Sequence, residues 1–224
     1  METIAALYPD TTTTEALGVD ALLLVRPYQV LAHTNKSHTR RVTVHGRDLA
    51  AKIVDFHGTP KHTSWSAREL YDLEWNEVRA YHALKALQGR VVPEFLYHGS
   101  DLNFLWATAV TTYEGVSLRH LVDDKGKLPA GAKAKAIGAL RALHAAGVLH
   151  GDAELRNAVW RERDGAVLWM NLEMAMLRDE VNEFAAKAER EVADVASLLE
   201  DVAEEAPPPR RSRCAFTRLP LCCA

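Results

Sequence analysis

The feature that most constrains the fold of this chain is a change in hydrophobic period along its length. Short β-rich runs come first, at residues 22–25, 41–44 and 49–56. The Gly46-Arg47 pair predicts a tight turn between the last two runs. From about residue 66 to residue 88, apolar side chains recur at spacings of three and four, which predicts an amphipathic helix ending at Gly89. This order predicts a strand-rich region that carries one long helix.

The rest of the chain continues with strands and then becomes mainly helical. The Asp164-Gly165 pair is a strong signal for a two-residue hairpin turn. The elements expected in this half are strands at 94–98 and 104–110, a helix ending at Gly147, hairpin strands at 157–161 and 166–172, and a last helix at about 179–204. We therefore expect an α+β protein with two lobes.

The predicted organisation has five parts. They are a loose leader (1–20), a strand-rich N-lobe (21–110), a hinge (111–115), a shortened helical C-lobe (116–206) and a flexible basic tail (207–224). The tail opens with three prolines, which remove helix donors, and it carries four arginines, which repel one another. Such a tail is either a solvated extension or a weak signal for nucleic-acid binding or nuclear import.

Composition restricts the possible surroundings and partners. Apolar residues make up 48% and charged residues 25%, which is typical of a soluble globular protein. A formal charge of -3 gives no global attraction to nucleic acid or to an anionic membrane. The start of the chain lacks the basic segment and long apolar core of a signal peptide, and all three cysteines lie near the other end. We expect an intracellular protein, cytoplasmic or nuclear, with neither a membrane nor a nucleic acid as partner.

Two charged residues stand at positions where apolar residues are expected. Glu77 lies on the apolar face of the predicted helix, and Lys52 lies inside the strand at 49–56. A carboxylate that faces a core costs several kcal/mol unless a cation meets it, so we expect the two residues to pair across a strand–helix contact. The alternative is two unrelated amphipathic side chains whose stems cover apolar surface while their heads reach water.

A polar loop follows the helix that ends at Gly147. Residues 150–157 read His-Gly-Asp-Ala-Glu-Leu-Arg-Asn and precede the Asp-Gly hairpin. Asp152 and Asn157, five residues apart, are of the types that supply a general base and an oxygen ligand for a hard cation. A chance polar loop remains the alternative, because aspartate and asparagine are common in loops.

Taken in order, these motifs resemble the protein-kinase signature set over residues 40–175: a lysine after alanines in a strand, a glutamate on the next helix, and His-x-Asp-x4-Asn before a hairpin. Segments 77–81 (Glu-Val-Arg-Ala-Tyr), 87–93 (Leu-Gln-Gly-Arg-Val-Val-Pro) and 150–157 resemble the compact fungal protein kinase-like family. The His-Gly-Asp triplet is similar to that of aminoglycoside and choline phosphotransferases. The resemblance implies a bilobal protein kinase-like fold that uses ATP and Mg²⁺.

The resemblance also implies a role for each matching residue. Lys52 would hold the α- and β-phosphates of ATP, and Glu77 would orient Lys52. Asp152 would accept the proton of the substrate hydroxyl, and Asn157 would coordinate magnesium. The position of the second magnesium ligand falls on Asn171.

Other implied roles concern the adenine and the support of the loop. The hinge residues Thr111, Thr112 and Tyr113 would receive the adenine through their backbone. Val110 falls where the residue controlling access to the rear of the adenine pocket belongs. Asp194 on the last helix is either an anchor for the 150–157 loop or an ordinary exposed helical aspartate.

The sequence departs from the kinase pattern at the second metal position. Fourteen residues after Asn157, where a kinase has the aspartate of Asp-Phe-Gly, this chain has Asn171. An asparagine offers a carbonyl oxygen but no negative charge, and Mg²⁺ prefers carboxylates. Losing one preorganised electrostatic contact commonly costs about 10²–10³ in rate. Glu173, two residues later, is the candidate to supply the missing charge.

Two further departures concern the phosphate loop and the helical lobe. Residues 28–44 contain no glycine, although a loop that covers phosphates normally uses glycines so that backbone donors approach closely. Residues 33–38 are expected to replace this loop. Either their polar side chains bind the nucleotide in place of backbone N–H groups, or no group of this segment binds it. There is no Ala-Pro-Glu segment, so most of the usual platform for a protein substrate is absent.

Other classes of site find little support. The ten histidines show no metalloenzyme spacing, and neither a Gly-x-Ser-x-Gly nor a Walker-type motif occurs. Two hypotheses remain open. The first is an ATP-dependent phosphotransferase that acts on a hydroxyl acceptor, protein or small molecule, with atypical metal binding. The second is a pseudokinase, a nucleotide-binding or scaffolding module without phosphoryl transfer.

Overall fold

The computed structural model describes residues 28–34, 36–56, 64–100 and 106–206. The strands are β1 Gln29–His33, β2 Ser37–Val44, β3 Arg47–Asp55, β4 Phe95–Ser100, β5 Trp106–Thr112, β6 Val116–Ser117, β7 Lys127–Leu128, β8 Val148–Leu149, β9 Ala158–Arg161, β10 Ala166–Trp169, β11 Met176–Leu177 and β12 Ala203–Glu204. The helices are α4 Ala67–Ala83, α5 Leu118–Lys125, α6 Ala132–Ala145 and α7 Phe184–Glu200, with short 3₁₀ turns η2 Lys85–Leu87, η3 Leu155–Asn157, η4 Leu172–Met174 and η5 Arg178–Glu180.

The larger sheet has five antiparallel strands in the order β1-β2-β3-β5-β4. The β2–β3 turn lies at His45 and Gly46, which both have positive φ, as a two-residue turn with the right twist requires. This turn begins one residue earlier than the sequence predicts. Because β3 lies in the middle of the sheet, its side chains are buried on both faces along most of its length.

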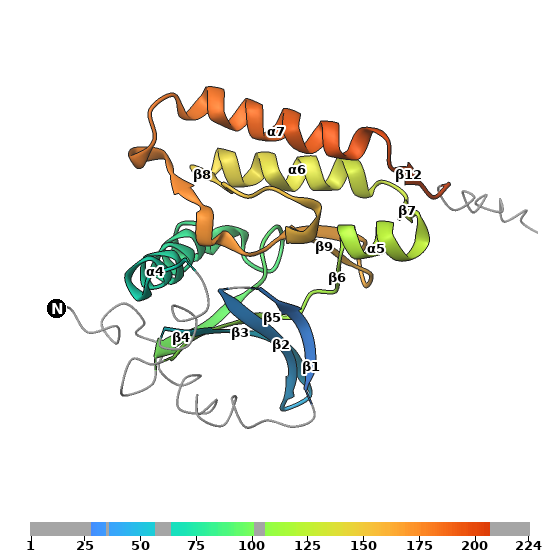
Figure 1. Cartoon of the computed structure of the whole chain (residues 1–224). Helices are drawn as coiled ribbons and strands as arrows, with labels where there is room; N and C mark the ends of the chain where they lie inside the picture. The colour runs from blue at the N-terminus through green and yellow to red at the C-terminus, as the bar shows by residue number, and fades with distance from the viewer. Residues whose placement is uncertain (1–27, 35, 57–63, 101–105, 207–224) are drawn as a thin grey trace, which may run out of the picture.

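Helix α4 begins where the sequence provides a complete capping box. The Ser66 side chain accepts a hydrogen bond from the Glu69 backbone, and the Glu69 carboxylate accepts one from the Ser66 backbone. The buried face of α4 carries Glu74 and Glu77 among apolar residues. In Figure 1 this helix lies between the sheet and the layer formed by α6 and α7. The helix predicted for 66–88 is therefore present, but its last part is η2 rather than α-helix.

The second layer is built on α6, which is covered on one side by α7 and on the other by the β9–β10 hairpin (Figure 1). The main hydrophobic core lies here, and the carboxyl-terminal end of α4 contributes Tyr81 and Leu84 to it. Trp169 is fully buried, and its indole Nε1 donates a hydrogen bond to the Ala136 carbonyl over 3.0 Å. The predicted hairpin is present, but its turn spans the four residues 162–165 and not the Asp164-Gly165 pair alone, so the expected two-residue turn is wrong.

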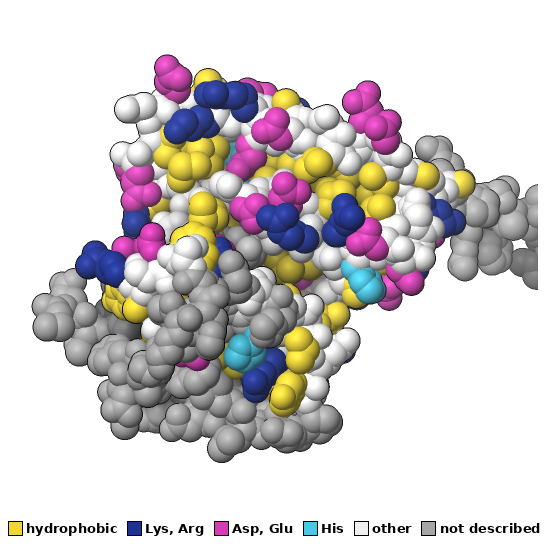
Figure 2. All heavy atoms as spheres, in the orientation of Figure 1, with side chains coloured by type: hydrophobic (Ala, Val, Ile, Leu, Met, Phe, Trp, Pro, Cys, Tyr) yellow, Lys and Arg dark blue, Asp and Glu magenta, His cyan; other side chains and the backbone are white. Residues whose placement is uncertain are grey.

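The α+β class expected from the sequence is confirmed. Strand β1 was not predicted, while the expected run at 22–25, the leader at 1–20 and the tail at 207–224 lie outside the described residues. None of the described helices has the length and apolar character needed to cross a membrane. Figure 2 shows acidic and basic side chains interspersed over the helical half of the visible face.

Leu140 on α6 provides a test of where the main core lies. Its side chain is fully buried, whereas Leu198 on α7 is 44% exposed. Leu140→Ala should lower the free energy of unfolding by about 2–5 kcal/mol, because it deletes buried methyl groups and leaves a cavity. The matched Leu198→Ala change should cost less than about 1 kcal/mol. Urea unfolding of the two variants measures the difference, and equal losses would contradict the assignment of the core.

Candidate functional site

Lys52 projects from the middle of β3 into a buried cluster of carboxylates. Its Nζ lies 2.7 Å from Glu77 Oε2 and 2.8 Å from Glu173 Oε2, and 3.4 Å from Glu74 Oε1. Glu74 and Glu77 lie one turn apart on the face of α4 that packs against the sheet, and Glu173 comes from η4. The predicted pairing of Lys52 with Glu77 is therefore present, and two further carboxylates join it.

The charges of this cluster are strongly coupled. Burial opposes the charge of Lys52, but the surrounding carboxylates outweigh it and hold the pKa of Lys52 well above its usual range. Burial also works against Glu173, yet Lys52 and Lys36 together hold the pKa of that carboxyl below its usual value. Burial raises the pKa of Glu74 to about 7, because Lys52 only partly offsets the desolvation.

Glu74 also faces a buried histidine. His98 Nε2 on β4 lies 3.7 Å from Glu74 Oε2, and both side chains are almost completely buried. Neither the Glu74 carboxylate oxygens nor the His98 ring nitrogens have a hydrogen-bond partner among the described residues. Burial and the nearby charge of Lys52 lower the pKa of His98 to about 4. At neutral pH the histidine is therefore uncharged, and the carboxyl group carries a fractional proton.

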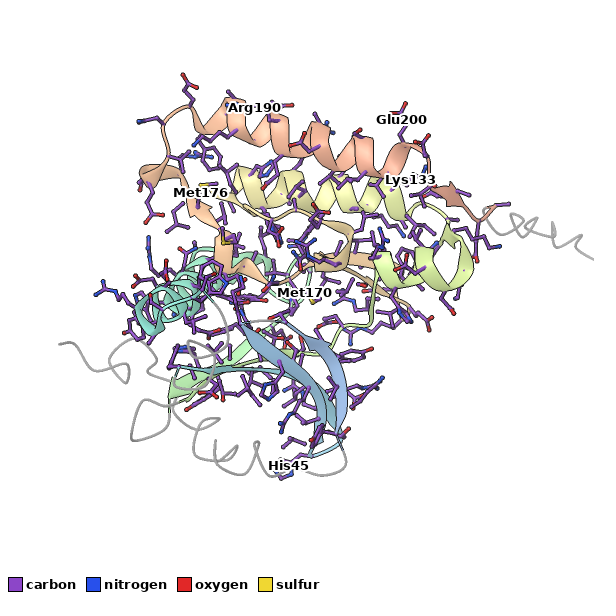
Figure 3. The ribbon with its side chains drawn as sticks, in the orientation of Figure 1. His45, Lys133, Met170, Met176, Arg190 and Glu200 are labelled. Carbon is purple, nitrogen blue, oxygen red and sulfur yellow. The ribbon has the colours of Figure 1, made fainter. Side chains whose placement is uncertain are left out.

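The second cluster is the loop of residues 150–157. The Glu191 carboxylate on α7 holds it from behind, because it accepts hydrogen bonds from the backbone N–H groups of His150 (3.1 Å) and Gly151 (2.7 Å). The same carboxylate lies 2.6 Å from His144 Nε2 on α6. The His150 ring lies against Trp169, and its Nε2 is 3.0 Å from the Met170 carbonyl. Figure 3 shows Met170 where the sheet meets the helical layer.

Asp152 and Asn157 are joined within this loop. Asn157 Nδ2 donates to the Asp152 carboxylate and to the Asp152 carbonyl, each over 2.8 Å. Arg156 binds both carboxylate oxygens of Asp152, at 2.7 and 2.9 Å, from an exposed position. Asp152 also lines an open groove beside α7, together with Met176, Arg190 and Glu191. Figure 3 shows Arg190 on α7 and Met176 on the segment below it.

The segment that contains η4 connects the two clusters. Asn171, with a left-handed φ of 62°, donates from Nδ2 to Asn157 Oδ1 over 3.3 Å. The next residue, Leu172, donates its backbone N–H to Glu77 Oε1 over 3.3 Å. The Asn76 side chain fixes the segment further by donating to the carbonyls of Glu173 (2.9 Å) and Ala175 (2.6 Å). Residues 171–173 therefore place the Lys52 cluster next to the Asp152 loop.

The residues present do not fit a resident magnesium ion. Asn157 and Asn171 offer neutral amides, and the Asn171 amide already donates to the oxygen that would face the ion. The nearest carboxylates are engaged, Asp152 by Arg156 and Glu173 by two lysines. Mg²⁺ is usually held by one or two carboxylates together with substrate phosphates. Among the described residues, no group of three His, Cys, Asp or Glu side chains is arranged to hold a metal.

The predicted hinge is only partly placed as expected. Val110 pairs with Ala51 and lies with Leu49 in the small core on the sheet face opposite Lys52. The expectation that Val110 lines the rear of an adenine pocket is therefore wrong, because paired residues on neighbouring strands share a face. Thr111 pairs with Ala50 and so lies on the face of Lys52.

Two backbone donors of the predicted hinge are also in use. The N–H of Thr112 donates to the Glu94 carbonyl and that of Tyr113 to the Asp48 carbonyl, both over 3.0 Å. These two amides are therefore satisfied within the chain. The ring of Tyr113 carries the guanidinium of Arg41, 4.3 Å from the ring centre, and Arg41 also binds Asp48.

Two residues of the site differ from the sequence interpretation. Glu191, and not Asp194, anchors the 150–157 loop, while Asp194 is exposed on α7. The helical period places Glu191 beside the buried Val192 and Val195, which was the one signal in the sequence for its role. That signal is weak, because glutamates are common along the edge between the buried and exposed faces of a helix. Glu173, the candidate for the missing charge at the metal position, is instead paired with Lys52 and Lys36.

A comparison of the chain with protein-family models and with curated proteins finds no match. The kinase-like resemblance therefore depends on the motifs and on the geometry described above.

Gly151 provides a test of how tightly the Asp152 loop is held. Gly151 and Gly126 both have left-handed φ values, of 78° and 69°, so alanine costs about 1–2 kcal/mol at either site. A Cβ at Gly151 would collide with the Met174 carbonyl, whereas at Gly126 nothing lies within 4 Å. We expect Gly151→Ala to lose about 1–3 kcal/mol more than Gly126→Ala in urea unfolding, because of overpacking. Equal losses would show that the loop shifts to accommodate the added Cβ at no further cost in stability.

Glu74 predicts a dependence of stability on pH. The pKa of Glu74 in the folded protein is about 7, above the ordinary value of 4.5. The folded state therefore binds a proton at Glu74 more tightly than the unfolded chain does, and protonation of this carboxyl stabilises the fold. That stabilisation is complete below the ordinary value and is lost as the pH rises through about 7. Glu74→Gln, which is permanently neutral, should therefore gain stability relative to the natural chain as the pH rises. Urea unfolding across this range measures the gain, and parallel pH profiles would contradict it.

Proposed function

We propose that this protein is an ATP-dependent phosphotransferase with a bilobal kinase-like fold, which transfers the γ-phosphoryl group to a hydroxyl acceptor. The observation that carries the proposal is the bridge at residues 171–173. It holds the buried Lys52–Glu77 pair beside the joined Asp152 and Asn157 side chains. In this arrangement a cation for phosphates and a carboxylate base belong to two clusters that three consecutive residues join.

The chemistry assigned to each residue follows from its surroundings. Lys52 is held charged by its carboxylates and would bind phosphate oxygens of ATP. The acceptor hydroxyl would approach through the groove beside α7 and give its proton to Asp152. As the acceptor oxygen bonds to the γ-phosphorus, the bond from that phosphorus to the β–γ bridging oxygen breaks, and ADP leaves with that oxygen. Arg156 and Asn157 orient the Asp152 carboxylate for this proton transfer.

Magnesium would arrive with the nucleotide, since phosphate oxygens supply the anionic ligands that Asn157 and Asn171 lack. The class of acceptor is open in this proposal, and both a protein and a small molecule are compatible with the open groove beside Asp152.

A second candidate function is a nucleotide-binding pseudokinase. The observation that favours it is Asn171, whose neutral amide is directed at Asn157 where a charged ligand would support phosphoryl transfer. The satisfied N–H groups of Thr112 and Tyr113 favour neither function over the other, because both functions would need donors for an adenine.

Asp152→Asn separates the two functions. The change keeps the shape of the side chain but removes the base, so γ-phosphate release from ATP, with water as the acceptor, should fall by about 10²–10⁴ while ATP affinity is kept. The control is Asp123→Asn, because Asp123 also pairs with an arginine four residues away, in an exposed position of α5. That variant should behave like the natural chain.

The outcomes are distinct. ATP binding with no turnover in the natural chain, and no change in Asp152→Asn, would favour the pseudokinase. A folded natural chain that binds no ATP in calorimetry, with or without Mg²⁺, would overturn both functions.

A further inference from the structure

We propose that Lys36 and Lys52 form a two-lysine clamp for the phosphate groups of the nucleotide, and that Glu173 competes with those phosphates for the clamp. This inference rests on the proposed function and extends it, since it names the groups that grip the phosphates and an internal group that limits their binding.

The geometry of the clamp is that of an anion held between two cations. Lys36 lies in the connection between β1 and β2, while Lys52 lies in β3. Glu173 uses Oε1 for the Lys36 ammonium and Oε2 for the Lys52 ammonium, the latter over 2.8 Å. The three side chains are only 18%, 11% and 8% exposed, and the ring of Trp65 lies against Lys36 with its centre 5.0 Å from the ammonium. Two oxygens of one carboxylate thus stand where two phosphate oxygens would bind.

In the loop that carries Lys36, the Lys36 side chain, and not the described backbone N–H groups, is placed to bind a phosphate. In a glycine-rich phosphate loop, backbone N–H groups donate to the phosphates. Here the N–H groups of Lys36 and Ser37 donate to the Thr34 hydroxyl over 3.2 and 3.0 Å, and the N–H of Thr34 donates to the Ser37 carbonyl over 2.8 Å. These donors are satisfied inside the turn. The Lys36 ammonium is therefore the group that this part of the loop presents to the Lys52 cluster.

The surroundings of Glu173 favour competition over metal binding. Both of its carboxylate oxygens are engaged by lysines, and its backbone carbonyl is held by Asn76. The cluster already places three carboxylates, with Glu74 and Glu77, around two ammonium groups. A phosphate added next to Glu173 would increase the excess of negative charge in a buried site, whereas exchange of one anion for the other avoids that cost. The clamp therefore takes either Glu173 or a phosphate.

Glu173→Gln tests the competition directly. The amide keeps the size of the side chain but removes the charge, so inorganic tripolyphosphate and metal-free ATP should bind at least about tenfold more tightly than to the natural chain. Lys36→Met keeps the apolar stem over Trp65 and should weaken both by about tenfold. Glu180→Gln is the control. It removes the ion pair between Glu180 on the 3₁₀ turn η5 and Arg79 on α4, which lies outside the cluster. Calorimetry measures all three, and thermal unfolding establishes that each variant is folded.

The possible results separate the inference from the proposed function. Tighter binding of both ligands to Glu173→Gln supports the clamp and the nucleotide site together. Tighter binding of tripolyphosphate without any binding of ATP supports the clamp but overturns the proposed function. Unchanged binding in Glu173→Gln, or weaker binding of the magnesium complex of ATP alone, overturns the competition, and the second result would make Glu173 a metal ligand. Unchanged binding in Lys36→Met removes Lys36 from the site.

Discussion

The buried charge of Lys52 is the constraint on which the rest of the site depends. An ammonium in the middle of a central strand costs several kcal/mol through lost hydration, and anions must meet it at close range. Those anions come from two separate elements, Glu74 and Glu77 on α4 and Glu173 on η4. The orientation of α4 on the sheet and the path of residues 171–175 are therefore linked. Asn76 strengthens this link from α4, through its hydrogen bonds to the carbonyls of Glu173 in η4 and of Ala175 just after it.

A second constraint operates behind the Asp152 loop. Glu191 satisfies two backbone N–H groups and contacts His144, so one carboxylate joins α7, α6 and the loop. Burial opposes the charge of Glu191, but the hydrogen bond with His144 and those from the backbone N–H groups of Gly151 and His150 hold its pKa below the usual value. Gly151 makes this approach possible, because a larger residue with its φ would meet the Met174 carbonyl. The loop is thus fixed by α7, and Asp152 and Glu191 both line the groove beside that helix.

Much of this arrangement was predictable from local sequence signals. The pairing of Lys52 with Glu77 followed from two charges at positions where apolar residues are expected. The hairpin after the Asp152 loop followed from its Asp164-Gly165 pair, although its turn has four residues and not two. The face of Val110 was not predictable in the same way, since a shift of one residue in a strand moves a side chain to the other face. Strand β1 also escaped prediction, because its partner β2 lies on one side only and its sequence, Gln-Val-Leu-Ala-His, has a weak alternation.

The partners of the site were the least predictable part, for a related reason. Glu173 lies 121 residues from Lys52, and Glu191 lies 41 residues from His150. Hydrophobic period locates a helix or a strand and its buried face, but it carries no information about which distant carboxylate meets a given cation. The departure at Asn171 was visible in the sequence, whereas the engagement of Glu173 by two lysines required the geometry.

The balance of charge around Lys52 decides between the two proposed functions. A phosphoryl-transfer site needs cations that are available to the transferred group and anions that hold those cations in place. Glu77 is suited to holding, because its other oxygen also accepts the Leu172 N–H and so fixes η4. Glu173 is suited to competing with phosphates, because its two carboxylate oxygens bind the ammonium groups of Lys36 and Lys52 that a nucleotide would use. If Glu173 yields readily to phosphates, the site has the parts of a transferase. If it holds the lysines firmly, the same residues make a stable core for a protein that keeps the architecture and performs no transfer.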